Sequence, residues 1–280
     1  MPGVKKLRGT SLEREVVSVE DRQSQYHDIM GDAGSLAEAP VVCCELVSQV
    51  PFVAAAVKHA RPNARVAYCM TDQGSLILEP DGLIARSKSA GLIDSIITCG
   101  QAVGGDMEAV NVYSGLLACR YVLEADVTIC GIGPGSVGTA TPFGTSAVAQ
   151  GESLNAVCSL NGTPIMPLRV SFAEKRERHY GVSYHSITVL TDICLEDVIV
   201  AVPKTFGFVT DSGLDERRIT VEHTLKSYHI HKRHDIIPVD INLAEIDMRG
   251  VNVTTLGRAD GEDSAYYAAA AAAGLVAVHG

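Results

Sequence analysis

Apolar and polar positions along the chain form blocks that predict strands and helices in turn. From position 40 onward, short apolar runs are bounded by glycine, proline and polar residues, and segments with helical spacing separate them. A nearly continuous apolar run is typical of a strand buried on both faces of a sheet. The predicted strands are 41–46, 65–70, 93–99, 126–132, 164–170, 198–202 and 234–241. The predicted helices are 51–60, 76–90, 106–123, 146–160, 187–194, 214–228 and 264–273.

This alternation predicts right-handed βαβ units and therefore a mostly parallel sheet. We expect an α/β fold of three layers, in which an open sheet of about seven strands carries helices on both faces. Residues 4–20 predict two short strands around a polar turn, and 21–39 read as a linker. The expected organisation is a short N-terminal hairpin and linker over 1–39, followed by a single α/β domain over 40–280.

Composition restricts the class of partner. The chain has no Trp, and its formal net charge is −10. A sequence-independent nucleic-acid binder needs a basic surface, so nucleic acid and anionic membranes are not expected partners. No apolar run approaches the length of a spanning helix, and the charged N-terminus lacks the apolar core of a signal peptide. We expect a cytoplasmic protein whose eight cysteines, none in a C-x-x-C pair, are mostly buried free thiols.

The stretch 126–151 is the strongest candidate for a ligand site, because a strand breaks into glycines and restarts as a helix there. It contains GPGSVG at 133–138, a literal dinucleotide-binding pattern. Pro142 disfavours a helix directly after that pattern, so an anion site formed by backbone amides and hydroxyls is a second interpretation. A purely structural loop is the third. The expected anion-binding residues are Gly133, Gly135, Ser136, Gly138 and Thr139.

Polar residues follow several predicted strands, where the carboxyl ends of a parallel sheet face a crevice. Glu45 and Asp72 suggest either a metal pair or an acid and a base, unless Asp72 caps a helix and Glu45 is solvated. Arg169 suits a ligand carboxylate or a neighbouring acid equally. Gln101 is expected at the same edge, with Asp240 as a further candidate.

Two other groups of residues could carry chemistry. Asp106 reads as a helix cap, and Asn111, one turn later, could point into the crevice. His179 and His185 lie in a polar loop after Arg169 and are the expected general acid or base, with Asp72. A surface loop with Ser183 as a helix cap is the alternative.

Metal sites are the weaker interpretation of two further patterns. The spacing of His229, His231 and His234 permits zinc binding but also suits a solvated turn. Three cysteines near strand ends (69, 99 and 130) permit a soft metal but also suit buried strands. No metal site is therefore predicted, and the cofactor stays unknown.

A set of motifs extends along most of the chain: Pro51 with its alanine-rich helix, RVAYCMTD (65–72), TCGQAVGGDMEAVN (98–111), GPGSVGT (133–139), QGESLN (150–155), RVSFA (169–173), 179–186 and TLGR (255–258). Together these motifs resemble the bacterial domain-of-unknown-function family 3866. The resemblance covers nearly the whole chain and implies a soluble bacterial protein without an established activity. Members carry a further β-rich N-terminal segment before residues 6–8, so the N-terminus is expected to be shortened. A weaker similarity in layout to the substrate-activating subunits of amino-acid reductases carries no activity over, because their nucleophilic thiol motif is not evident.

The functional expectation is a small-molecule site at the carboxyl edge of the sheet, binding an anionic metabolite or nucleotide. The alternative is a non-catalytic, oligomeric assembly or regulatory protein whose glycine loop packs against a partner subunit. A homo-oligomer is expected in either case.

Overall fold

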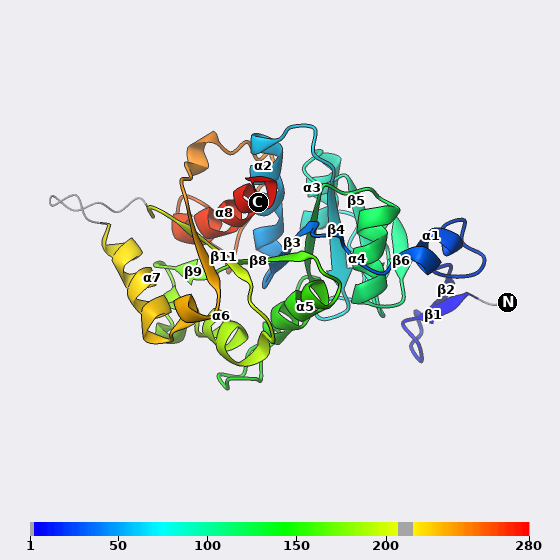
Figure 1. Cartoon of the computed structure of the whole chain (residues 1–280), viewed down its shortest axis with the longest axis horizontal. Coiled ribbons are helices and arrows are strands. Elements are labelled where there is room, and N and C mark those ends of the chain that lie inside the picture. Colours follow the sequence, from blue (N-terminus) through cyan, green and yellow to red (C-terminus); the bar gives the residue numbers. More distant parts are fainter. Residues whose placement is uncertain (1–2, 207–214, 280) are drawn as a thin grey trace.

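The computed structural model describes residues 3–206 and 215–279 of the chain (Figure 1). A parallel sheet lies at its centre, with the strand order β12-β11-β8-β3-β7-β4-β5-β6. The three-layer α/β fold is thereby confirmed, with eight strands in place of about seven. The strands of this sheet are β3 (Pro40–Cys44), β4 (Val66–Thr71), β5 (Ser95–Cys99), β6 (Met107–Ala109), β7 (Val127–Ile132), β8 (Thr163–Pro167), β11 (Ile199–Pro203) and β12 (Asp235–Val239).

Helices cover both faces of this sheet. One apolar cluster contains buried residues of α2, α3 and most of α8, and the other contains buried residues of α1, α4, α5, α6 and α7 together with Ala265 and Ala269 of α8. Figure 1 shows α2 and α8 lying together on the first face. The helices are α1 (His27–Asp32), α2 (Val50–Ala60), α3 (Leu83–Ser89), α4 (Val112–Tyr121), α5 (Val148–Ser159), α6 (Tyr184–Thr188), α7 (Glu216–Ser227) and α8 (Ser264–His279).

Near the N-terminus, β1 (Val4–Lys6) pairs antiparallel with β2 (Arg14–Val16) to form a hairpin. Its Lys6 is fully buried, and Lys6 Nζ donates to Thr98 O, Ala102 O and Glu108 Oε2 at 2.8–2.9 Å. The hairpin is thus attached to the β6 side of the sheet, as Figure 1 shows. The predicted linker 21–39 contains the short helix α1.

The remaining elements are short. A second antiparallel pair, β9 (Val170–Ser171) with β10 (Gly181–Val182), follows β8. A π-helical turn, η3 (Val189–Ile193), continues α6. The 3₁₀ turns are η1 (Val47–Gln49), η2 (Glu177–His179), η4 (Ile230–Lys232) and η5 (Leu243–Glu245).

Three predicted helices begin or end elsewhere. The prediction of a helix from position 106 was wrong at its start, because Met107–Ala109 pairs with β5 and α4 begins after Asn111. The helix predicted over 76–90 is limited to α3, because Ile77 forms a bridge with Val103. The helix predicted over 187–194 begins earlier, after Ser183, whose side chain accepts a hydrogen bond from His185 N. The predicted start of α7 at Leu214 lies outside the described residues.

The connections change direction between two neighbouring strands. β3 leads into α2 on one face of the sheet, whereas β7, its hydrogen-bonded neighbour, leads into α5 on the opposite face. In open α/β sheets, a crevice for ligands forms outside the carboxyl ends of strands at such a switch point. Glu45 follows β3 and Gly133 follows β7, so both lie at this position.

In the described parts of the chain, no helix combines the length and apolar character needed to cross a bilayer.

Candidate functional site

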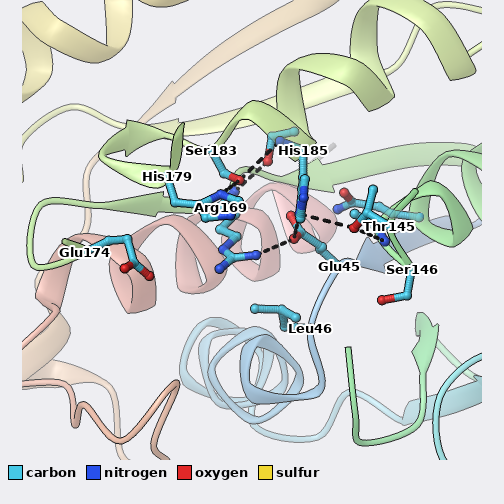
Figure 2. Close-up of polar contacts among 12 residues, drawn as sticks. Glu45, Leu46, Thr145, Ser146, Arg169, Glu174, His179, Ser183 and His185 are labelled. Carbon is cyan, nitrogen blue, oxygen red and sulfur yellow. Dashed lines mark hydrogen bonds and ion pairs between the residues drawn. The ribbon is translucent and has the colours of Figure 1, made fainter. Parts of the chain in front are cut away.

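Three predicted site residues meet at the carboxyl edge around a fourth, Glu45 (Figure 2). Arg169 Nη1 donates to Glu45 Oε1 at 2.8 Å, and His185 Nδ1 lies 3.3 Å from the same oxygen. The ring of His179 packs edge-on against that of His185, with 4.7 Å between centroids. The group joins the ends of β3 and β8 to the segment that contains η2 and α6. We call Glu45, Arg169, His179 and His185 the charged cluster.

Local hydrogen bonds explain these positions. Gln49, which is buried, accepts from the backbone amides of Glu45 and Leu46 and so fixes the turn after β3. Ser186 Oγ accepts from Arg169 N at 3.0 Å, and Ser183 N donates to Arg169 O at 2.8 Å. The loop after Arg169 is therefore folded back over the sheet edge, as the sequence predicted.

Glu45 is ionised although it is only 3% exposed. Burial raises the pKa of its carboxyl, but the charge of Arg169 and the hydrogen bond from His185 outweigh burial and lower that pKa. Glu45 Oε2 has no hydrogen-bond partner among the described residues. The sequence left a ligand carboxylate and a neighbouring acid open as partners of Arg169. The structure shows the neighbouring acid, Glu45, so the charge of this guanidinium is already neutralised.

His179 is held in one tautomer by its neighbours. Arg178 Nε donates to His179 Nε2 at 3.1 Å, and His179 Nδ1 lies 2.8 Å from Ser183 Oγ. Because a guanidinium only donates, Nε2 accepts and Nδ1 carries the proton. Burial and the charge of Arg169 lower the pKa of His179 to about 4. With both nitrogens engaged, His179 orients Ser183, the cap of α6, and has no free nitrogen for a ligand.

His185 keeps one nitrogen free. Its Nδ1 lies between Glu45 Oε1 and Thr145 Oγ1, at 3.3 and 3.4 Å. Since an ionised carboxylate only accepts, Nδ1 carries the proton and Nε2 presents a lone pair. Nε2 makes no hydrogen bond within the described residues, and a methyl group added at Gly138 would lie 3.5 Å from it. Of the two predicted histidines, His185 is the one with a ring nitrogen free to contact a ligand.

The glycine loop, residues 133–147, is folded as a small hairpin. Thr139 N donates to Gly144 O at 2.8 Å, and Ser146 N donates to Val137 O at 2.9 Å. Thr139 Oγ1, a hydroxyl predicted to bind the anion, also donates to Gly144 O and so stabilises the loop. Helix α5 begins only at Val148, which confirms that no helix opens within the GPGSVG motif.

The remaining predicted loop donors are backbone groups. The amides of Gly135, Ser136 and Gly138 donate to no acceptor in the described parts of the chain. Gly133 is buried, and its place is set by a close approach: a Cβ there would lie 2.3 Å from Ser75 O. The loop is thus preformed, with three exposed amides available for an anion.

A cavity of about 240 Å³ lies at the same edge of the sheet as the charged cluster, at the carboxyl ends of β4 and β5. Two predicted residues, Asp72 and Asn111, line it. Gln101 lies next to it, since Gln101 N donates to Asp72 Oδ2 at 3.0 Å. The lining residues are Thr71, Asp72, Gln73, Cys99, Gly100, Val110, Asn111, Val112, Ala149, Glu152 and Ser153. We call this space the β4–β5 cavity.

Asp106 is the predicted site residue that lies elsewhere. Its carboxylate accepts from Ile96 N at 2.8 Å and pairs with Lys88. Ile96 is near the amino end of β5, so Asp106 stands at the opposite edge of the sheet. The error has the same cause as the misplaced helix start, because β6 separates Asp106 from α4.

Several lining residues were missed by the sequence analysis. Thr71 ends a buried strand, and Glu152 and Ser153 lie on a predicted helix, so no pattern singled them out. Glu45 was recognised at the edge, but its partners come from positions more than 120 residues away. A single charged residue directly after a fully apolar strand was the signal that could have ranked it higher.

Metal sites receive no support from the described residues, which contain no group of three or more His, Cys, Asp or Glu able to hold an ion. His234 is buried, with Nε2 bonded to Leu190 O and Nδ1 to Val198 N. A larger cavity of about 850 Å³ lies at the amino ends of β8 and β11, lined by four acidic side chains and no basic one. It contains no predicted site residue and lies opposite the switch point.

Comparison with known proteins gives a family and no further relative. No curated protein and no solved structure matches the chain. Residues 3–274 match the family described as "Protein of unknown function (DUF3866)", and the chain therefore belongs to that family.

Proposed function

We propose that the protein binds a small molecule with an anionic group in the β4–β5 cavity. The observation that carries this proposal is that the amino terminus of α4 lines a cavity at the carboxyl edge of the sheet. Val112 N donates to no acceptor in the described parts of the chain, and Asn111 Oδ1 accepts from Ser114 N at 3.1 Å. A helix amino terminus favours negative charge, because its first amides are unpaired and its dipole is positive there.

The volume limits the ligand. A water molecule occupies roughly 30 Å³ of liquid, so about eight waters would fill a space of this size. A small carboxylate or phosphate metabolite fits better than a nucleotide. Any larger ligand would have to extend toward the exposed amides of the glycine loop, which adjoins this region through the hydrogen bond from Ser75 N to Pro134 O.

The proposal concerns binding and not a reaction. Asp72 lines the cavity, whereas His185 does not, and no hydrogen bond joins the two within the described residues. His185 remains the group we expect to exchange a proton with a ligand that reaches the glycine loop.

Native mass spectrometry under gentle and then denaturing conditions tests the proposal. We expect a co-purified small molecule, and an increase in melting temperature with at least one member of a panel of small carboxylates, amino acids among them, and phosphates. Ala149→Leu, which fills the cavity, should abolish both effects, whereas Ala244→Leu, on an exposed turn, should leave them unchanged. If the unmodified protein carries no ligand and melts at one temperature with every compound, the proposal is wrong.

A second candidate, the assembly role, is favoured by two apolar side chains on the glycine loop. Val137 and Phe143 are 66% and 62% exposed. Gly135 has a φ of +98°, which a β-branched side chain adopts only with strain. Under this alternative the protein is an oligomer, and both Gly135→Val and Phe143→Ser convert it to monomers in the same mass spectra.

A further inference from the structure

We infer that the β4–β5 cavity takes a small zwitterion, a molecule with an ammonium group at one end and a carboxylate at the other. This inference rests on the proposed function and names the class of ligand for the same cavity. The cavity presents two kinds of group to a ligand: exposed carboxylates at its rim that have no basic partner among the described residues, and the amide donors at the start of α4.

The carboxylates are Asp72 and Glu152. Asp72 Oδ2 accepts from Gln101 N at 3.0 Å, and Glu152 Oε2 accepts from Gln73 Nε2 at 2.6 Å. Both partners are neutral, and no basic side chain pairs with either acid within the described residues. No Lys, Arg or His lines the cavity. The free oxygens of the two acids therefore suit an ammonium group, which carries three donors and a positive charge.

The start of α4 provides the complementary part. Val112 N has no acceptor, and the side chain of Asn111 keeps its amide hydrogens free because its oxygen caps the helix. These donors suit a carboxylate. A ligand with a negative charge alone would meet the field of Asp72 and Glu152, and one with a positive charge alone would leave the helix amides unpaired.

Thr71 gives independent evidence that a polar ligand atom belongs in this space. The residue is 8% exposed, and its Oγ1 has no hydrogen-bond partner within the described chain. Side chains alternate along β4, so Thr71 points to the same face as Cys69, whose sulfur lies against Gly115 of α4. The cavity lies on that face. A buried hydroxyl without a partner costs free energy, which a ligand atom beside it would offset.

The apolar walls set the size of the remaining part. Val110, Val112 and Ala149 leave room for a short carbon skeleton between the two charged ends. Because the cavity holds only about 240 Å³, an amino acid with a small side chain fits better than one with a large or aromatic side chain.

Isothermal titration calorimetry with matched probes tests the inference. L-Alanine is compared with propionate, which lacks the ammonium group, with ethylamine, which lacks the carboxylate, and with L-tryptophan, which exceeds the cavity. We expect L-alanine to bind at least about tenfold more tightly than any of the others, since tenfold corresponds to about 1.4 kcal/mol. Asp72→Asn and Glu152→Gln should each weaken L-alanine without weakening propionate. Glu177→Gln, an exposed acid on η2, serves as the control.

The outcomes separate this inference from the proposed function. Equal binding of propionate overturns the ammonium part, and equal binding of ethylamine overturns the carboxylate part. If none of the probes binds but mass spectrometry finds another ligand that Ala149→Leu removes, the zwitterion is wrong and the binding function stands. If neither experiment finds a ligand, both proposals are wrong.

Discussion

Arg169 owes its place in the core to Glu45. The two form an ion pair of 2.8 Å in which neither side chain is more than a tenth exposed. Removing one partner of a buried pair leaves an uncompensated charge and typically costs about 3–5 kcal/mol. We predict that Arg169→Met lowers the free energy of unfolding by this amount, measured by urea denaturation.

The double variant Arg169→Met with Glu45→Gln is the control for this prediction. It removes both charges, so it should recover part of the loss. Equal stability of Arg169→Met and the unmodified protein would show that the pair does not support the fold.

His179 makes stability depend on pH. Its pKa falls from 6.5 to about 4 on folding, because burial and the charge of Arg169 disfavour the protonated ring. The unfolded chain therefore binds the proton more readily, and stability is complete above pH 6.5 and declines as the pH falls toward 4. The shift corresponds to a loss of about 3 kcal/mol at most. Burial lowers the pKa of His234 as well, so that group adds to the decline.

Denaturation curves at pH 7.5, 6 and 4.5 measure this dependence. His179→Asn keeps a donor for Ser183 but does not titrate, so its stability should change less across the range. An identical decline in the variant would assign the pH dependence to other groups.

At the scale of elements, the apolar runs predicted all the sheet strands except β6. That strand has three residues, and its Glu108 is fixed by Lys6, a residue 102 positions earlier. A local pattern has no access to such a partner, so the acidic start of 106–123 was interpreted as a helix. The short helix α1 was missed for a related reason, because Gly31 lowers its propensity and its burial depends on contacts with α4.

The contact between α8 and α2 depends on a small residue. At Gly274 of α8, a Cβ would lie 2.3 Å from Val53 O and 2.9 Å from Ala56 Cβ. We predict that Gly274→Ala lowers the free energy of unfolding by about 1–3 kcal/mol, the usual cost of overpacking, despite the higher helix propensity of alanine.

Gly31 of α1 is a matched control, because nothing lies within 4 Å of a Cβ built there. Gly31→Ala should raise stability by up to about 1 kcal/mol, since only propensity changes. Thermal melting of both variants checks the pair of predictions, and a stabilised Gly274→Ala would mean that the helices separate at little cost.

At the scale of the whole molecule, the sequence predicted which edge of the sheet carries the site, but not which residues come together there. The alternation of strands and helices indicated a parallel sheet, and the carboxyl ends of such a sheet gave the place of Glu45, Asp72, Arg169 and the glycine loop. Which of them meet depends on strand order. Because β8 lies beside β3, Arg169 contacts Glu45, whereas Asp72 at the end of β4 lines a separate cavity.

The same strand order aligns cysteines across the sheet interior. Cys43 and Cys69 both pair in register with Cys130, and Cys69 lies 3.4 Å from Cys99 through their sulfurs. Seven of the eight cysteines are buried, and Cys158 is half-buried. Because the thiolate is the reactive form, burial that raises a thiol's pKa also slows its chemistry.

We therefore predict that Ellman's reagent modifies at most one thiol of the native protein, and eight after denaturation. Burial raises the pKa of Cys158 and raises that of Cys194 to about 12, so even the half-buried thiol should react slowly at neutral pH. Cys158→Ser should remove the native reaction, and labelling of the other thiols should then proceed at the rate of global unfolding. Cys99 provides the sharpest test, because it lines the β4–β5 cavity. A thiol that reacts fast in Cys158→Ser, and no longer reacts when Cys99→Ser is added to that variant, would show that the cavity opens far more widely than its volume indicates.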